Sequence, residues 1–235
     1  TYFRQTLKTA FPIAVSLVLV LIYFKLDTVL LSLMKPAEDV GIYSVAYKVL
    51  EAVIFLPAVY IGLVMPLLSR HGVTNRAEFI KTFSQAFNVI SIFALPFAVY
   101  LFILSDGLVK LVGGGQFLAS GPVLKILSLA IFLIFFGNLG GNAIIALNFQ
   151  KKGMWIYLGG AIVNVTANLI LIPRFSYFAT AWTTVVTELL ITVWMFAMIK
   201  KELGILPKFS IFGKATMATV VMVLLILPFS HSLWK

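Results

Sequence analysis

The chain has 235 residues, of which 61% are hydrophobic and 11% charged, and its mean hydropathy is +1.07. A soluble domain carries roughly 25% charged residues to cover its core, so this composition excludes an ordinary soluble protein and predicts one that faces lipid. The formal net charge is +10, but the basic residues are scattered between apolar runs. That distribution favours membrane-topology signals over a nucleic-acid patch.

Metal and cofactor sites are not indicated. The chain has no cysteine, which excludes disulfides and thiolate metal sites. Its two histidines, His71 and His231, lie far apart at the ends of apolar segments, so we expect no metal site. The triplet at 113–115 is all glycine but isolated, and we interpret it as a turn after a short helix rather than a phosphate loop. We therefore expect no cofactor.

Apolar stretches of about 20 residues, the length that crosses a bilayer, recur along the chain. Seven are predicted to span the membrane: Phe11–Leu33, Val40–Leu68, Phe87–Leu104, Pro122–Leu147, Trp155–Ile172, Phe178–Met198 and Ile211–Phe229. They predict an all-α, polytopic transmembrane helix bundle. The stretch Asn75–Ala86 is amphipathic, with Phe79 and Phe83 at helical spacing, and we expect it to lie at the membrane interface.

The Lys and Arg residues between these segments predict the orientation, since cytoplasmic loops carry the excess. If the segments alternate in direction, eleven fall on the side of the N-terminus: Arg4, Lys8, Arg70, Arg76, Lys81, Lys151, Lys152, Lys200, Lys201, Lys208 and Lys214. Five fall on the other side: Lys35, Lys110, Lys125, Arg174 and Lys235. The split predicts a multi-pass protein of the cytoplasmic membrane with the N-terminus of this chain in the cytoplasm.

Ionisable side chains inside spans are costly and therefore candidates for function. Lys25 and Asp27 lie in the first predicted span, and Lys48 and Glu51 in the second, with Tyr47 one turn before Glu51. Both lysines are predicted roughly 12 Å below the outer ends of their helices. Lys25 and Asp27, two residues apart, should point away from each other, whereas Lys48 and Glu51 share a face. Two interpretations remain open and can coexist: buried ion pairs, Asp27–Lys48 or Lys25–Glu51, and a water-accessible translocation cavity.

Later spans hold weaker polar candidates. Glu188, near the middle of its span and four residues after Thr184, is the strongest of them, because it carries a charge or a proton at membrane depth. Amides in spans more often bond to a neighbouring helix than to a substrate, so we treat the others as structural or secondary candidates. They are Asn138, Asn142, Asn164, Asn168 and Arg174.

Three stretches resemble the multidrug/oligosaccharidyl-lipid/polysaccharide exporter superfamily, and within it the polysaccharide and O-antigen flippases. They are Phe11–Leu31, which contains Tyr23-Phe24-Lys25-Leu26-Asp27; Val40–Arg70, which ends in Met65-Pro66-Leu67-Leu68-Ser69-Arg70; and Asn164–Glu188. Together they cover most of the chain in the expected order.

The resemblance implies one lobe of a two-lobe, alternating-access transporter. The chain would be the C-terminal lobe plus one extra helix, with a six-helix N-terminal lobe before Thr1 and one further helix after Lys235. The first two helices of each lobe would line a central cavity, and Lys25, Asp27, Tyr47, Lys48 and Glu51 lie on those helices. Together with Glu188 of the later span, they are the substrate-cavity candidates.

The implied function is translocation of a polyprenyl-pyrophosphate-linked oligosaccharide across the cytoplasmic membrane, with a proton or sodium as a possible coupling ion. A cation-coupled multidrug antiporter or a peptidoglycan lipid-precursor flippase of the same superfamily is the alternative, although cavity lysines argue against an antiporter for cationic drugs. A membrane-embedded glycosyltransferase or polymerase is remote, because the outer loops offer only Glu38, Asp39 and Asp106 as catalytic carboxylates. We expect a transporter that is not an enzyme.

Overall fold

The computed structural model of the chain describes residues 2–204, 207 and 210–230 and contains no strand within them. Its elements are α1 (Tyr2–Met34), α2 (Ala37–Thr74), α3 (Arg76–Ile103), α4 (Ser105–Gly113), the short 3-10 turn η1 (Gly115–Phe117), α5 (Ser120–Ala146), α6 (Gln150–Leu203) and α7 (Ser210–Ser230). The all-α prediction is confirmed. The glycine triplet forms the predicted turn, where Gly114 adopts a positive φ of 85° that favours glycine.

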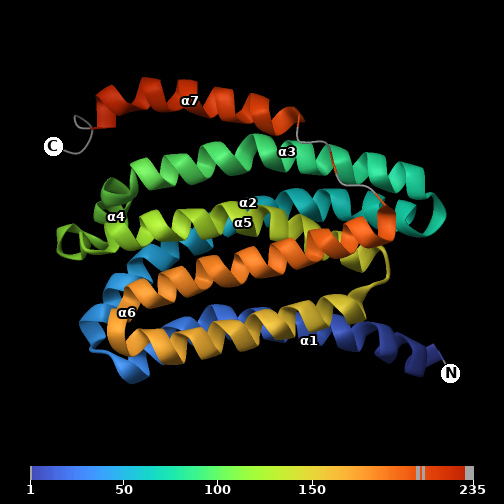
Figure 1. Cartoon of the computed structure of the whole chain (residues 1–235), viewed down its shortest axis with the longest axis horizontal. Helices are drawn as coiled ribbons and strands as arrows, with labels where there is room; N and C mark the ends of the chain where they lie inside the picture. Colours follow the sequence, from blue (N-terminus) through green and yellow to red (C-terminus); the bar gives the residue numbers. More distant parts are fainter. Residues whose placement is uncertain (1, 205–206, 208–209, 231–235) are drawn as a thin grey trace.

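The long helices lie side by side along the long axis of the molecule, with α7 packed against α3 (Figure 1). Helix α6 doubles back on itself, and we call residues 150–175 its first leg and 177–203 its second leg. Each predicted span lies within a helix, to within one residue at its end, and two of the spans lie in the legs of α6. Within the described residues, five helices are long and apolar enough to cross a membrane, and α7 adds the shorter apolar stretch Ile211–Leu224.

The reversal in α6 is held by the corner between α1 and α2. Ser176 has a φ of 49° and a ψ of −133°, a conformation that costs a non-glycine residue about 1–3 kcal/mol. Its hydroxyl donates to the carboxylate of Asp39, in the first turn of α2. Lys35 Nζ donates to the backbone carbonyl of Pro173 at 3.0 Å. These contacts offset the cost of the strained residue and fix where the helix turns.

The connections gather at two ends of the bundle (Figure 1). The end with the α2–α3 and α5–α6 connections, which we call the basic end, carries Arg70, Arg76, Lys151 and Lys200. The opposite end holds the α1–α2 corner, α4 and the bend of α6. The alternation that the charge count assumed is therefore present, while the assignment of the basic end to the cytoplasm stays a prediction. Lys208, His231 and Lys235 lie outside the described residues.

The stretch Asn75–Ala86 belongs to α3 and its apolar stripe packs inside the bundle, while its position at the membrane interface stays a prediction. Asn75 caps α3, since its side-chain oxygen accepts from the backbone N–H groups of Ala77 at 3.1 Å and Glu78 at 3.2 Å. The helix then runs unbroken to Ile103. Phe79 and Phe83 are buried and stack on each other, and Phe83 packs against Phe196 of α6. The apolar stripe therefore packs on the protein core.

Helix α5 is the centre of the bundle and packs against α2, α3 and α6. Glycines let the helices of this core approach closely. A Cβ atom at Gly160 would lie 2.5 Å from Ile191 Cδ1, and one at Gly140 would lie 3.2 Å from Met195 Cβ. The second leg of α6 thereby packs closely on both the first leg and α5, and its Thr184 contacts α1.

Candidate functional site

The carboxylate of Asp27 lies in the C-terminal part of α1 and is buried inside the bundle. Its side chain is fully buried, and one oxygen accepts from Asn168 Nδ2 at 2.7 Å. The other accepts from the hydroxyls of Thr184 at 2.8 Å and Tyr43 at 3.3 Å. Because these partners lie on the two legs of α6 and on α2, Asp27 joins three helical segments. All of its donors are neutral.

We call Asp27, Tyr43, Asn164, Asn168 and Thr184 the Asp27 cluster. Asn168 Nδ2 also reaches Asn164 Oδ1 at 3.3 Å, so the two asparagines act together. Within the described residues, Asn164 Nδ2 and Asn168 Oδ1 are buried without a hydrogen-bond partner, and no basic side chain forms a salt bridge with Asp27. A buried carboxylate with neutral neighbours and unmet polar atoms is a site that a cation or a proton would complete.

Glu188 is a second buried carboxylate, 3% exposed, and accepts from the Tyr23 hydroxyl at 2.9 Å. Tyr23 and Asp27 lie one turn apart on α1, as Thr184 and Glu188 do on the second leg of α6. The two helices are thus joined by two parallel contacts, Asp27–Thr184 and Tyr23–Glu188. Glu188 therefore faces the interior of the lobe rather than the surface that carries Lys25.

The other side of α1 carries exposed charges. Lys25 Nζ lies 2.6 Å from Glu51 Oε1 of α2 and 5.6 Å from the centre of the Tyr47 ring. Lys48, also on α2, is exposed and forms no salt bridge within the described part of the chain. We call Lys25, Tyr47, Lys48 and Glu51 the charged face. Tyr47 itself is buried and stacks on Tyr43, which connects the charged face to the Asp27 cluster.

The structure decides between the ion pairs that the sequence left open. The Lys25–Glu51 pair is present, and the opposite directions of Lys25 and Asp27 are confirmed. The alternative pair, Asp27–Lys48, is wrong. Side chains two positions apart on a helix point about 200° away from each other. Because Lys25 is on the exposed side of α1, Asp27 points into the lobe, away from the exposed Lys48 of α2.

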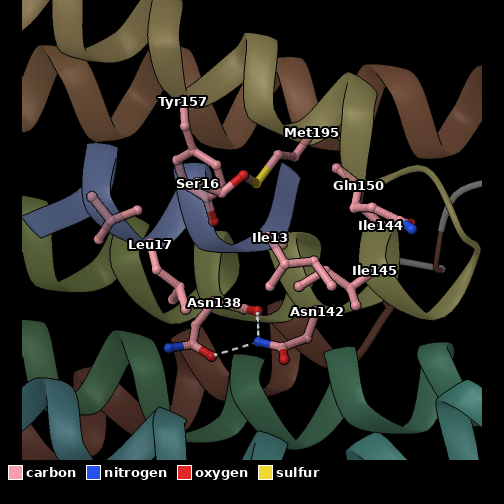
Figure 2. Close-up of a pocket in the computed structure, with 13 residues that line it drawn as sticks. Ile13, Ser16, Leu17, Asn138, Asn142, Ile144, Ile145, Gln150, Tyr157 and Met195 are labelled. Atoms are coloured by element: carbon pink, nitrogen blue, oxygen red, sulfur yellow. Dashed lines mark hydrogen bonds between the residues drawn. The ribbon is translucent and has the colours of Figure 1, made fainter. Parts of the chain in front are cut away.

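The remaining candidates separate into two places. Asn138 and Asn142 line a cavity between α1, α5 and α6 (Figure 2). The expectation that they bond to a neighbouring helix is wrong, because Asn142 Nδ2 donates to the carbonyl oxygen of Asn138 at 2.9 Å and to its side-chain oxygen at 3.2 Å, both on α5 itself. Arg174 is exposed at the bend of α6 and belongs to neither the Asp27 cluster nor the charged face.

Sequence reasoning missed two of the neutral partners, Tyr23 and Tyr43. Tyr23 precedes Asp27 by four residues and Tyr43 precedes Tyr47 by four, a spacing that could have marked both tyrosines as neighbours of the candidate residues. The two histidines do not enter the site: His71 Nδ1 lies 3.1 Å from the Thr82 hydroxyl at the basic end. Within the described residues, no three His, Asp or Glu side chains come together as metal ligands.

Residues 1–71 match the sequence profile of a family described as "Polysaccharide biosynthesis protein". This region includes all of α1 and the charged face. No curated protein matches the chain in sequence. The expected resemblance to polysaccharide flippases is confirmed by this profile for the two stretches that lie within residues 1–71, Phe11–Leu31 and Val40–Arg70.

Solved transporters share the fold. A lipid II flippase, MurJ, in an inward closed conformation superposes with a TM-score of 0.79 at 16% identity, over 96% of this chain and 48% of that protein. An outward-facing multidrug resistance MATE transporter of the MOP superfamily gives 0.73 at 14% identity, over 94% and 53%. A MOP superfamily transporter from Pyrococcus furiosus, described as having a binding pocket of reversed polarity, gives 0.69 at 14% identity, over 91% and 50%.

The chain spans about half the length of these solved structures. Every one of them is described as a flippase or a transporter, in agreement with the expectation of a transporter that is not an enzyme. The chain is a multi-pass membrane protein with the fold of the MOP transporter superfamily, and its first 71 residues carry the sequence pattern of polysaccharide biosynthesis proteins.

Proposed function

We propose that the complete protein flips a polyprenyl-diphosphate-linked oligosaccharide across the cytoplasmic membrane for the synthesis of a surface polysaccharide. The observation that carries this proposal is Lys48, an exposed lysine without a salt bridge in the described residues, beside the Lys25–Glu51 pair. A lysine at membrane depth costs on the order of 3 kcal/mol. Binding of a substrate diphosphate would offset that cost while the lipid tail stays in the bilayer.

In this proposal the charged face lines one wall of a central cavity, and a second lobe of the complete protein supplies the other wall. The polysaccharide family profile at residues 1–71, which include the charged face, supports an oligosaccharide substrate. The lipid II flippase fold supports a second candidate, the peptidoglycan lipid precursor, which is also a lipid-linked saccharide. Both candidates use the same cation for the diphosphate and differ in the sugar.

We also infer that the Asp27 cluster binds the coupling ion, a proton or a sodium ion. Asp27 is fully buried, its donors are neutral, and Asn168 Oδ1 is an unmet oxygen beside it. Oxygen atoms of carboxylates, amides and hydroxyls are the ligands that a hard cation prefers. The Tyr43–Tyr47 stack places the cluster directly behind the charged face, so ion loading and substrate binding act on the same pair of helices.

Substitution of Lys48 tests the proposal. Lys48→Gln in the complete protein should leave its abundance in the membrane unchanged, because no carboxylate loses a partner, and should lower polysaccharide export at least tenfold. Lys48→Arg should retain most of the export, since arginine keeps the charge and also binds phosphate. Export would be measured in cells lacking the endogenous flippase. Normal export by Lys48→Gln would refute recognition of the diphosphate by this lysine.

A further inference from the structure

A cavity of about 240 Å³ lies between α1, α5 and both legs of α6, apart from both the charged face and the Asp27 cluster (Figure 2). Helices α1 and α5 both line it, although neither packs extensively on the other. Its polar lining comes from Ser16, Asn138, Asn142, Gln150 and Tyr157, and none of its lining residues is charged.

These polar groups have unused hydrogen-bonding capacity. Asn142 directs its amide N–H groups at Asn138, so Asn142 Oδ1 and Asn138 Nδ2 make no hydrogen bond within the described part of the chain. Gln150 Oε1 is buried there without any partner. Figure 2 shows Asn138 and Asn142 side by side on α5, with Gln150 and Tyr157 approaching from α6. Unmet polar groups among membrane helices are costly, so such a set points to a bound polar molecule.

The lining selects the chemistry of that molecule. Without a charged lining residue the cavity cannot compensate the negative charge of a phosphate. A lipid tail has no polar groups and would leave the three side-chain amides without hydrogen-bond partners. Side-chain amides offer a donor and an acceptor together, which suits neighbouring hydroxyl groups, and Ser16 and Tyr157 add hydroxyl partners. The volume lies below the roughly 300–1,000 Å³ of pockets for drug-sized ligands, which matches a single small ring.

We propose that this cavity binds one neutral saccharide ring. The proposal rests on the proposed function for the source of the sugar, which is the saccharide of the lipid-linked substrate. Ser16 lies roughly 13 Å along α1 from Lys25 but on the opposite side of the helix. Leu17, which also lines the cavity and is 61% exposed, lies only about 80° around the helix from Lys25, so the cavity reaches the side of α1 that adjoins the charged face. An oligosaccharide attached to a diphosphate at the charged face is long enough to bring a ring to that level. The diphosphate and the sugar would then be recognised by different residues of the same lobe.

Two variants reduce the cavity's capacity in different ways. Asn142→Ala removes an amide whose only hydrogen bonds are within α5, so it leaves no other helix without a partner. Gly141→Ala adds a methyl group 2.6 Å from the Tyr157 hydroxyl, which must shift into the cavity. Gly62→Ala on α2 is the matched control, since no atom lies within 4 Å of its added methyl group.

The test uses the purified complete protein and three probes: polyprenyl diphosphate bearing one glucose or N-acetylglucosamine, bare polyprenyl diphosphate, and the free sugars. Asn142→Ala and Gly141→Ala should each weaken binding of at least one glycosylated probe about tenfold and leave bare polyprenyl diphosphate unchanged. Gly62→Ala should bind all probes normally. Lys48→Gln should weaken both lipid probes equally, which tests the proposed function separately.

Equal weakening of the bare and glycosylated probes by the cavity variants would show a general disturbance of the lobe and overturn the sugar site. Wild-type protein that binds every glycosylated probe no better than the bare one would also overturn it. Free sugar that binds in an Asn142-dependent manner, while the glycosylated lipids do not depend on Asn142, would overturn the lipid-linked source. If Lys48→Gln binds both lipids normally, diphosphate recognition fails, and the sugar site is still judged by the cavity variants.

Discussion

The two sides of α1 show how one helix serves two environments. Lys25 and Asp27 are separated by a single residue, yet Lys25 is exposed beside Glu51, whereas Asp27 is fully buried among neutral donors. The exposed side pairs opposite charges that remain partly solvated. The buried side holds its charge with hydroxyls and amides from two legs of α6. The difference agrees with the two proposed roles, recognition of a charged ligand on the exposed side and binding of an ion or a proton on the buried side.

The largest effect is expected at Asp27. Asp27→Asn keeps the shape and most hydrogen bonds of the cluster, so the protein should insert at normal levels, but polysaccharide export should fall to background because the ion site has lost its charge. Asp27→Ala should in addition lower the free energy of unfolding by several kcal/mol, since three donors lose their acceptor at about 1–3 kcal/mol each. Export in cells and thermal unfolding in detergent separate the two outcomes. Full export by Asp27→Asn would show that transport does not need the charge of this carboxylate and would contradict the proposed ion site.

A smaller effect is expected from the second contact between α1 and α6. Tyr23→Phe deletes the hydroxyl that donates to Glu188, so a buried carboxylate oxygen loses its partner at a cost of about 1–3 kcal/mol. The melting temperature in detergent should therefore drop by several degrees. Tyr100→Phe, a substitution at an exposed tyrosine of α3, is the control and should leave the melting temperature unchanged. An unchanged value for Tyr23→Phe would show that this contact does not hold the helices together.

On the exposed side, the Lys25–Glu51 pair should matter less than Lys48. Its side chains are 62% and 44% exposed, and exposed pairs contribute about 0–1 kcal/mol to stability. Lys25→Gln should leave the free energy of unfolding within about 1 kcal/mol of the wild-type value. It should also reduce export less than Lys48→Gln does, because Glu51 already compensates the charge of Lys25. The double variant Lys25→Gln/Glu51→Gln should behave in the same way. A loss of export by Lys25→Gln equal to that of Lys48→Gln would contradict this ranking.

The smallest effect is expected from single cysteine substitutions that test on which side of the membrane each end of the bundle lies. The chain has no cysteine, so a single introduced cysteine reports its own position. In intact cells, cysteine at Lys151 should be protected from an impermeant thiol reagent, and cysteine at Lys35 or Arg174 should react. Export should remain normal with cysteine at Lys151 or Arg174, whereas cysteine at Lys35 also removes the hydrogen bond to Pro173 and is used for its labelling alone. Reaction at Lys151 alone would reverse the predicted orientation of the basic end.

Much of the candidate site followed from local spacing. The helical repeat alone separated Lys25 from Asp27, and it placed Asn164 with Asn168 and Thr184 with Glu188. The helical repeat could not predict which of these residues contact one another across different helices. Asp27 is 141 residues from Asn168 and 157 from Thr184, so their contact depends on how α6 folds back onto α1. The packing of the stripe in Asn75–Ala86 could not be predicted for a related reason: the apolar face of an amphipathic helix packs equally well on lipid or on another helix.

The sequence by itself determined the helical class, the spans, the side on which basic residues gather and the presence of charges at membrane depth. Each of these depends on residues close together in the chain, where the apolar length and the 3.6-residue repeat apply directly. Only the tertiary structure decided that Lys25 pairs with Glu51 and that Asp27 pairs with neutral groups instead of Lys48. It also decided that Asn138 and Asn142 line a cavity. Those outcomes depend on the bend at Ser176 and on close approach at Gly160, because a hydrogen-bond partner is chosen by which helix faces touch.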